Sequence, residues 1–363
     1  MKLFLLHLPL IALFALLAES PELKAQPSTD TLTPVKKFSF FGVPLAFYSP
    51  DTKWGGGAAG IFTFPGNPLR SSITFSFAYT QRRQVLAWIP FQWYHRNGNW
   101  RAYGELGWYR YLYQYFGIGN EYPDDFLETY TARFPRVRWT VARRWRDSRH
   151  FFGLRYNLDD YHISDATPGG DLASGNIPGA RGGFSSSPGI VWLYDSRDSP
   201  FFPSRGILTE SSVVFENRFS GSNFRYARWT GEVSGYRKIG RNILAINALA
   251  VFTTAGAPFF LMPQLGGTRR LRGYPDGKFR DKHMLLVQAE GRVPLFWRLK
   301  AVAFGGAGSV FGTGGETLRL HSNLGAGIRF EFDKKQKINV RLDYGFGIGT
   351  PHSGAYLTVG EAF

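Results

Sequence analysis

Residues Leu271-Arg272-Gly273-Tyr274 place an arginine and a glycine between two large apolar side chains, within the charged, glycine-rich stretch 266–280 (GGTRRLRGYPDGKFR). The arginine guanidinium is a permanently charged planar group that can bind a carboxylate through two N–H groups at once. Large apolar neighbours are unusual for a solvated loop arginine. We therefore expect this loop to fold inward and to hold Arg272 against acidic groups on an interior wall. A solvated arginine is the alternative.

Alternation of apolar and polar side chains dominates the sequence after residue 37. The clearest segments are 73–80, 137–145 and 337–346. In the last of these, Leu342, Tyr344 and Phe346 alternate with Arg341 and Asp343. Successive side chains of a strand point to opposite faces, so this pattern predicts strands with one apolar and one polar face.

The number of alternating segments is about sixteen, from near residues 40–48 to near residues 355–363. Their apolar faces are rich in aromatic residues, which make up 17% of the chain. No helical crossover interrupts the series. We therefore predict an all-β fold, a transmembrane antiparallel β-barrel with lipid outside and a wet lumen inside. The polar stretches 163–188 and 256–282 are the expected extracellular loops, and the second is the loop that folds inward.

The N-terminus resembles an export signal. Lys2 precedes an apolar run over residues 3–17, with small residues following up to Ala25. The run is short for a membrane-spanning helix and suits a secretory signal, although a membrane anchor is the alternative. We expect a signal peptide over residues 1–25, with cleavage between Ala18 and Gln26. A short periplasmic segment over residues 26–37 and a barrel over residues 38–363 would follow.

The formal net charge is +16, and cysteine is absent. Nucleic-acid binding is one interpretation of such a charge. The basic residues are spread over the strands and form no nucleic-acid motif, so no nucleic-acid partner is expected. A cationic lumen, or contact with anionic headgroups of outer-membrane lipid and lipopolysaccharide, fits this spread better.

The sequence offers little support for enzymatic chemistry. Residues 55–60 (GGGAAG) fit a phosphate-binding glycine pattern but lack the following helix that this mechanism needs. No G-x-S-x-G elbow is present, and the histidines are scattered rather than clustered as metal ligands. We expect no catalytic residues, no metal and no cofactor.

Four motifs occur along the chain, and both their residues and their order are informative. They are residues 195–198 (DSRD) followed by 202–206 (FPSRG), then LRGY at 271–274, QAEGRVPL at 288–295 and VRLDYG at 340–345. Together they resemble the BamA/TamA family of outer-membrane barrels, also called the bacterial surface antigen family, over residues 38–363.

The resemblance implies two sets of functional residues. The barrel motif comprises Asp195, Arg197, Asp198 and Gly206, and the loop lock comprises Arg272, Gly273 and Tyr274 with Glu290 as the receiving carboxylate. The family's second acidic partner is the aspartate of an F-x-D motif. The corresponding residues here are Phe304-Gly305-Gly306, so either the lock is weaker or another lumen-facing acid, Asp343 or Glu331, replaces this aspartate.

The seam between the first and last strands is the third candidate site. We expect Gly42 and Pro44 to weaken the first strand, because proline cannot donate to a ladder and glycine adds no side-chain packing. The alternative is that Pro44 faces a gap or bulge without consequence. The last strand is expected to end on Phe363 with Leu357 and Val359 on the same face, although Glu361 departs from that pattern.

The family resemblance implies an outer-membrane protein of Gram-negative bacteria that assists insertion or translocation of client proteins through this seam. Family members with this role carry periplasmic POTRA domains, and residues 26–37 leave no room for one. A periplasmic partner would then supply that function. The alternative is a passive channel or structural barrel that has lost the insertase role.

Overall fold

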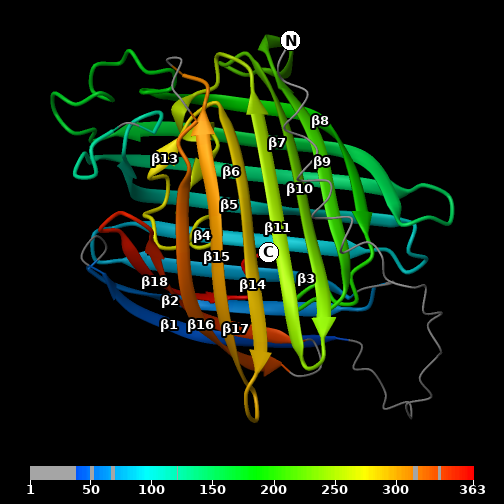
Figure 1. Cartoon of the computed structure of the whole chain (residues 1–363). Helices are drawn as coiled ribbons and strands as arrows, with labels where there is room; N and C mark the ends of the chain where they lie inside the picture. Colours follow the sequence, from blue (N-terminus) through cyan, green and yellow to red (C-terminus); the bar gives the residue numbers. More distant parts are fainter. Residues whose placement is uncertain (1–37, 50–52, 67–69, 121, 314–317, 334–336) are drawn as a thin grey trace.

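The computed structural model describes residues 38–49, 53–66, 70–120, 122–313, 318–333 and 337–363 (Figure 1). The expected signal peptide at 1–25 and the segment 26–37 lie outside the described residues. Within the described part of the chain, no helix is long and apolar enough to cross a membrane.

One antiparallel sheet of 16 strands forms the body of the protein, and its strand order follows the order of the chain. This confirms the predicted fold class and number of strands. Figure 1 shows the sheet curling so that β14 and β15 cross in front of β4 and β5. Strands β1 and β18 stand at the two ends of the pairing order. The strands of the sheet are β1 Ser39–Ser49, β2 Lys53–Phe64, β3 Ser71–Thr80, β4 Val85–Tyr94, β5 Trp100–Tyr115, β6 Glu128–Arg144, β7 His150–Ser164, β8 Gly182–Asp195, β9 Gly206–Glu216, β10 Tyr226–Ile239, β11 Asn242–Thr253, β14 His283–Pro294, β15 Leu299–Phe311, β16 His321–Asp333, β17 Ile338–Gly347 and β18 Ser353–Val359.

The remaining elements lie in the connections between strands. A 3-10 helix, η1 (Arg218–Ser220), joins β9 to β10. The long connection from β11 to β14 contains a second 3-10 helix, η2 (Phe259–Leu261), and a small ribbon of β12 (Gln264–Leu265) with β13 (Phe279–Arg280). This connection carries the LRGY residues.

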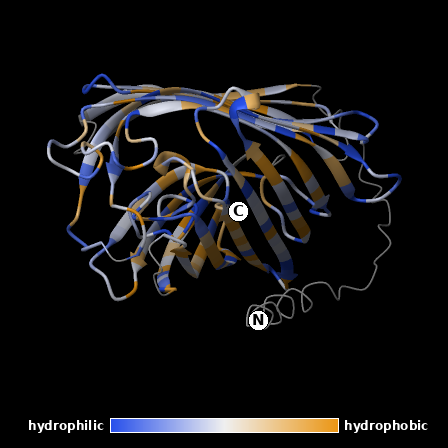
Figure 2. Cartoon of the chain, turned by 90° about the horizontal axis from the view of Figure 1, so that it is seen from above, coloured by the Kyte–Doolittle hydropathy of each residue, from blue (hydrophilic) through white to orange (hydrophobic). Residues whose placement is uncertain are grey.

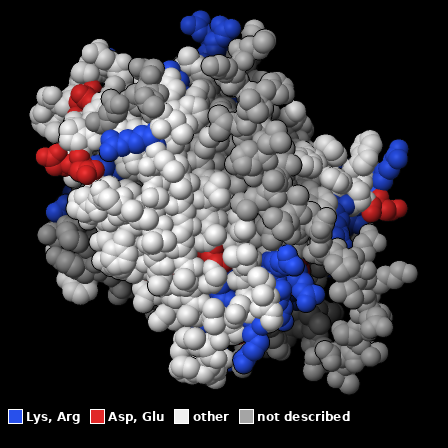
Figure 3. All heavy atoms as spheres, viewed as in Figure 1, with Lys and Arg blue, Asp and Glu red and all other residues white. Residues whose placement is uncertain are grey.

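The side chains divide between the two faces of the sheet as the alternation predicts. Phe77, Trp139 and Leu342 are 47%, 55% and 52% exposed, whereas Arg341 and Asp343 are buried. Figure 2 shows hydrophilic and hydrophobic bands alternating along the strands. In Figure 3, the middle of the visible surface carries few charged side chains, and Lys and Arg gather toward the lower end. An apolar exterior and a polar interior suit a barrel in lipid.

Two predicted boundaries were wrong. The polar stretch 163–188 is not all loop, because β8 begins at Gly182 and pairs with β7 from there. Ser185 and Ser187 face the interior and donate their hydroxyls to Glu216, both at 2.5 Å. A run of serines therefore belongs to a strand with a polar inner face. The last strand ends at Val359 rather than at Phe363, because Gly360 adopts a φ of +85°.

The connections at the two ends of the barrel differ in length. Since neighbouring strands are antiparallel, the connections after β5, β7, β9 and β11 share one end, and these include the long segments 165–181 and 254–282. The opposite end has short turns, such as 240–241 between β10 and β11, and one longer connection, 196–205, between β8 and β9.

The barrel motif builds this longer connection. Arg197 donates from Nε and Nη2 to the two carboxylate oxygens of Asp195, both at 3.0 Å, and Arg101 on β5 donates to Asp195 Oδ2 at 2.9 Å. Asp198 accepts from the backbone N–H of Ser204 at 2.8 Å. The Asp195 bonds fix the start of the connection to β5 and β8, and the Asp198–Ser204 bond joins two parts of the connection to each other.

Gly206 closes this motif. Its φ of +99° is unfavourable for L side chains, and an added Cβ would overlap the backbone oxygen of Ser196. We predict that Gly206→Ala destabilises the barrel by about 2–3 kcal/mol, since strained backbone and a backbone clash act together. Urea unfolding of the protein refolded in detergent measures this.

Gly240→Ala is the matched control for Gly206→Ala. Gly240 also has a positive φ, +58°, but an added Cβ there meets no atom within 4 Å. We expect it to lose only about 1 kcal/mol. Equal losses in the two variants would show that the clash with Ser196 has no energetic weight.

Candidate functional site

The LRGY segment lies inside the barrel, as the apolar residues around Arg272 predict. Leu271 and Tyr274 are fully buried and belong to one apolar cluster. The other members of that cluster are Leu249, Val251, Leu265, Phe279, Met284, Leu286 and Val310. Leu271 adopts a φ of +56°, which is rare for a residue with a side chain. The cluster therefore anchors the loop on both sides of the arginine.

Arg272 joins two strands of the wall. Its Nη2 donates to Glu290 Oε1 on β14 at 2.6 Å, and its Nη1 donates to Asp343 Oδ2 on β17 at 2.5 Å. The arginine side chain is 1% exposed, and the two carboxylates are 0% exposed. Buried charges are stable only when they are paired and hydrogen-bonded. The loop therefore cannot leave this position without uncovering three charged groups.

Phe304 and two glycines shape the space around Arg272. The guanidinium carbon of Arg272 lies 3.6 Å from the centre of the Phe304 ring on β15. On β16, a Cβ at Gly325 would overlap the Phe304 ring, and a Cβ at Gly327 would overlap the Asp343 carboxylate. The missing side chains on β16 thus leave room for a ring from one neighbouring strand and a carboxylate from the other.

The structure distinguishes between the two acids that could replace the missing family aspartate. Asp343 contacts Arg272, whereas Glu331 lies 3.4 Å from Lys300 in a separate, partly exposed pair. At the Gly306 position, an added Cβ would come 2.8 Å from the Cβ of Gln288. The second acid of the lock therefore comes from β17, two strands beyond the position of the family motif.

Gly273 and Tyr274 hold the loop backbone against β16, β17 and β18. Gly273 has a φ of +117°, and an added Cβ would come 2.7 Å from the backbone nitrogen of Phe346. Its N–H donates to the Tyr356 hydroxyl on β18 at 2.9 Å. The Tyr274 hydroxyl donates to the backbone oxygen of Ser322 at 3.0 Å. The loop thus touches the last strand directly.

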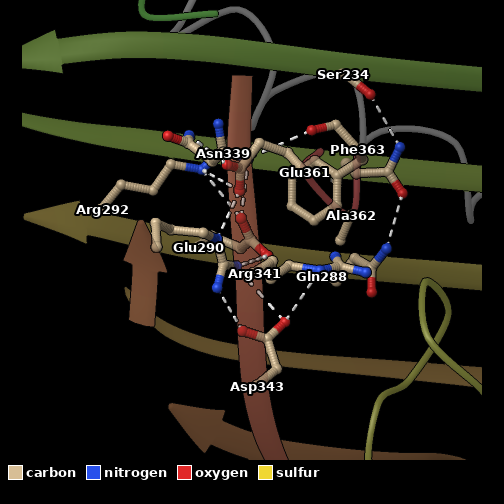
Figure 4. A network of polar contacts seen from close by, with 12 residues as sticks. Ser234, Gln288, Glu290, Arg292, Asn339, Arg341, Asp343, Glu361, Ala362 and Phe363 are labelled. Carbon is tan, nitrogen blue, oxygen red and sulfur yellow. Dashed lines mark hydrogen bonds and ion pairs between the residues drawn. The ribbon is translucent and has the colours of Figure 1, made fainter. Parts of the chain in front are cut away.

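Three more arginines complete a charged network around the lock, and Figure 4 labels two of them, Arg292 and Arg341. Arg292 donates from Nε and Nη2 to Glu290 Oε2, at 3.0 and 2.8 Å. Arg329 on β16 donates to Asp343 Oδ1 at 2.5 Å, and Arg341 donates to the Thr268 backbone oxygen at 3.0 Å. Sequence reasoning did not assign these arginines to the lock. All three occupy inward positions on strands whose polar and apolar residues alternate, so this alternation was the signal that could have identified them.

Phe363 does not lie on the last strand, contrary to prediction. After Gly360 the chain turns into the interior, where Glu361 Oε2 accepts from Arg329 Nε at 2.8 Å. The Phe363 backbone oxygen accepts from Arg292 at 3.3 Å. The glutamate that breaks the apolar pattern is the reason, since a lipid-facing carboxylate would be unpaired. Phe363 therefore does not lie at the seam.

The other two seam residues lie on β1, at one end of the pairing order. Gly42 is opposite Gly60 and Pro44 is opposite Ala58 in the ladder with β2. The Pro44 nitrogen has no hydrogen to donate. The structure thus separates the three predicted sites: the lock lies in the interior, the barrel motif forms the β8–β9 connection at one end, and Gly42 and Pro44 occupy an end strand.

A second set of contacts attaches the same loop to β5, β6 and the connection between them. Phe259 in η2 is buried edge-on against Tyr115 and Tyr130, with ring centres 5.5 and 5.3 Å apart. The Lys278 ammonium donates to the backbone oxygen of Asp124 at 3.0 Å. Burial lowers the pKa of Lys278, and the nearby Asp124 and Asp125 oppose this shift. The loop therefore spans the interior from β5–β6 to β14–β17.

The arrangement is suited to holding the loop in place. Its arginines and carboxylates bind one another and the loop backbone. In the described ranges of the chain, no group of three or more His, Cys, Asp or Glu side chains is placed to hold a metal ion.

The chain is similar to a known protein family and to several solved structures. Residues 64–363 match the Omp85 superfamily domain. No curated protein matches the sequence. Among solved structures, BamA from Haemophilus ducreyi lacking POTRA domains 1–3 matches with a TM-score of 0.56 and 13% identity, over 89% of this chain and 70% of that one.

Two structures of CdiB match as well. CdiB from Escherichia coli gives a TM-score of 0.60 at 13% identity, over 91% of this chain and 63% of that chain. CdiB from Acinetobacter baumannii gives 0.53 at 13% identity, over 89% and 60%. At these identities the likeness concerns the fold, and the chain spans less than two thirds of either CdiB.

We predict that Asp343→Asn destabilises the folded barrel by about 3–5 kcal/mol, since it removes one partner of buried charged pairs. Because Arg272 and Arg329 both bind Asp343, neither keeps its full set of partners. The measurements are urea unfolding and heat-modifiable electrophoretic mobility in detergent.

Glu331→Gln is the matched control, because Glu331 pairs with Lys300 in a partly exposed position. We expect it to lose no more than about 1 kcal/mol. If Asp343→Asn is as stable as Glu331→Gln, the buried pairing does not hold the loop.

Proposed function

Because the chain belongs to the Omp85 superfamily, we propose that it is an outer-membrane β-barrel that assists insertion of proteins into the outer membrane, or their translocation across it. The proposed route is a lateral seam between β1 and β18. The action is mechanical, so the protein is not an enzyme and needs no catalytic residue or cofactor.

The single observation that carries this proposal is the Arg272 lock. It ties the inward loop to β14 and β17, and Gly273 extends the tie to Tyr356 on β18. One side of the proposed seam is therefore braced from within by buried charge. A braced edge can stay in place while the other edge moves.

The opposite side of the proposed seam is β1, which pairs less strongly with a neighbouring strand. Pro44 offers no N–H, and Gly42 adds no side chain to pack. An end strand with unpaired N–H and C=O groups is a template for an incoming strand. We propose that β1 separates from β18 and pairs with a client strand, while the lock keeps β14–β18 in register.

The proposed partners follow from this mechanism. The apolar exterior meets outer-membrane lipid, and exposed basic groups meet lipopolysaccharide. The clients are other outer-membrane proteins. We propose that a periplasmic partner delivers these clients to the barrel.

A passive channel or structural barrel is the second candidate, and the net charge of +16 is the observation that favours it. A cationic interior would select anionic solutes. Two facts weigh against an open path: the loop spans the interior, and residues 361–363 fill the space beside it. The absence of the family aspartate at Gly306 does not favour this candidate, because Asp343 binds Arg272 instead.

Cysteine crosslinking tests the seam, because the natural chain has no cysteine. Phe40→Cys on the outer face of β1 is combined in turn with cysteine at Ala355, Leu357 and Val359 on the outer face of β18. We predict that a formed crosslink reduces insertion of a client barrel into proteoliposomes to background, and that reduction restores it.

The control for the seam crosslink shares the same β1 cysteine. Phe40→Cys with Phe62→Cys joins residues that are directly opposite in the β1–β2 ladder, so it locks a hairpin and leaves the seam free. This variant should retain activity when oxidised. Full activity in the seam-crosslinked protein, or no crosslink at any β18 position, contradicts the proposal.

A further inference from the structure

Arg292 binds Glu290 of the loop lock through the carboxylate oxygen that Arg272 does not use. Glu290 divides its two oxygens between them: Oε1 accepts from Arg272 at 2.6 Å, and Oε2 accepts from Arg292 at 2.8 and 3.0 Å. Arg292 is itself 1% exposed. One buried carboxylate therefore fixes both guanidinium groups. Displacement of one guanidinium changes the electrostatic environment of the other.

The rest of the Arg292 guanidinium faces a cluster of rings. Its central carbon lies 5.3 Å from the ring centre of Phe202, 5.8 Å from that of Tyr236 and 5.9 Å from that of Phe363. The Lys300 ammonium lies 4.8 Å from the Phe202 ring. Cations over ring faces are attracted to them, more strongly where water is excluded.

Phe202 is the part of this cluster that belongs to another loop. It lies in the connection 196–205 between β8 and β9, yet it is 6% exposed because it reaches into the interior. The base of that connection is fixed by the Asp195–Arg197 pair. Phe202 is therefore held at one side by its own loop and at the other by Arg292 and Lys300.

A continuous set of buried contacts thus runs from one end of the barrel toward the other. It passes from Arg272 in the 254–282 connection through Glu290 and Arg292 to Phe202 in the 196–205 connection. These two connections lie at opposite ends, because one follows an odd-numbered strand of the sheet and the other follows an even-numbered strand.

We propose that Arg292 is a positioning residue that couples the two loops, so that release of Arg272 from the lock frees the 196–205 connection at the far end. Arg292 acts through Glu290 on one side and through the Phe202 ring on the other. Displacement of Phe202 would weaken the lock by the same coupling, since coupling between two sites is reciprocal. The inference goes beyond the proposed function, because it concerns contacts within the barrel alone.

A cysteine reporter at Pro203 tests the coupling. Pro203 is buried next to Phe202, and Pro203→Cys should react slowly with a membrane-impermeant maleimide in the purified barrel. We expect Arg272→Ala to raise that labelling rate about tenfold, within the usual range for coupled sites. In an Arg292→Gln background the rate should already be high, and Arg272→Ala should add less than about twofold, because non-additivity is the signature of direct coupling.

Two controls separate coupling from general loosening. Arg241→Cys sits in the exposed β10–β11 turn at the same end as Pro203, and its labelling should not respond to Arg272→Ala. If Arg292→Gln fails to give the heat-modifiable folded form, Phe202→Leu takes its place, because leucine fills the space without an aromatic face.

Two outcomes overturn the inference. One is an unchanged Pro203→Cys rate in Arg272→Ala while a cysteine at the exposed Thr268 becomes more reactive, which shows a loosened loop without transmission. The other is multiplication of the Arg272 and Arg292 effects, which shows independence. Neither readout involves client insertion, so the coupling and the proposed function can fail separately.

Discussion

The structure depends on the burial of one guanidinium between two carboxylates. Arg272, Glu290 and Asp343 are all excluded from water, and each is stable there because it is paired with an opposite charge. A buried pair of this kind adds little net stability compared with an apolar core. It makes one loop position far more favourable than any position that leaves a charge unpaired. The constraint is therefore on conformation, and the rest of the interior is arranged around it.

That constraint explains features of the wall that are otherwise unconnected. Gly325 and Gly327 lack side chains on β16 because a ring and a carboxylate from neighbouring strands occupy the space. Arg329 and Glu361 extend the charged network toward the end of the chain, which consequently turns inward at Gly360. The apolar cluster around Leu271 and Tyr274 fixes the loop on either side. The ion pairs of Arg272 determine the position of the loop, and the apolar cluster stabilises that position.

Alternation in the sequence was sufficient to predict the strands, and the family resemblance identified Arg272 and Glu290 as partners. Alternation depends only on the backbone period, so Leu342 and Asp343 could be placed on opposite faces without a structure. The choice between Asp343 and Glu331 required the register of β15, β16 and β17, because both acids occupy inward positions. The inward turn of residues 361–363 depended on Arg329 and Arg292, which are distant in sequence. Phe202 was unpredictable for the same reason, because its contacts cross the barrel.

The most direct test of the account is outer-membrane proteomics after depletion of this protein in its own host. The account predicts a broad loss of other β-barrels from the outer membrane, because their strands would lack the seam that templates insertion. It also predicts that Arg272→Ala, expressed at the natural level, fails to restore them. An unchanged barrel inventory after complete depletion would contradict the assembly role and leave the passive channel, for which anion conductance in planar bilayers is the measurable property.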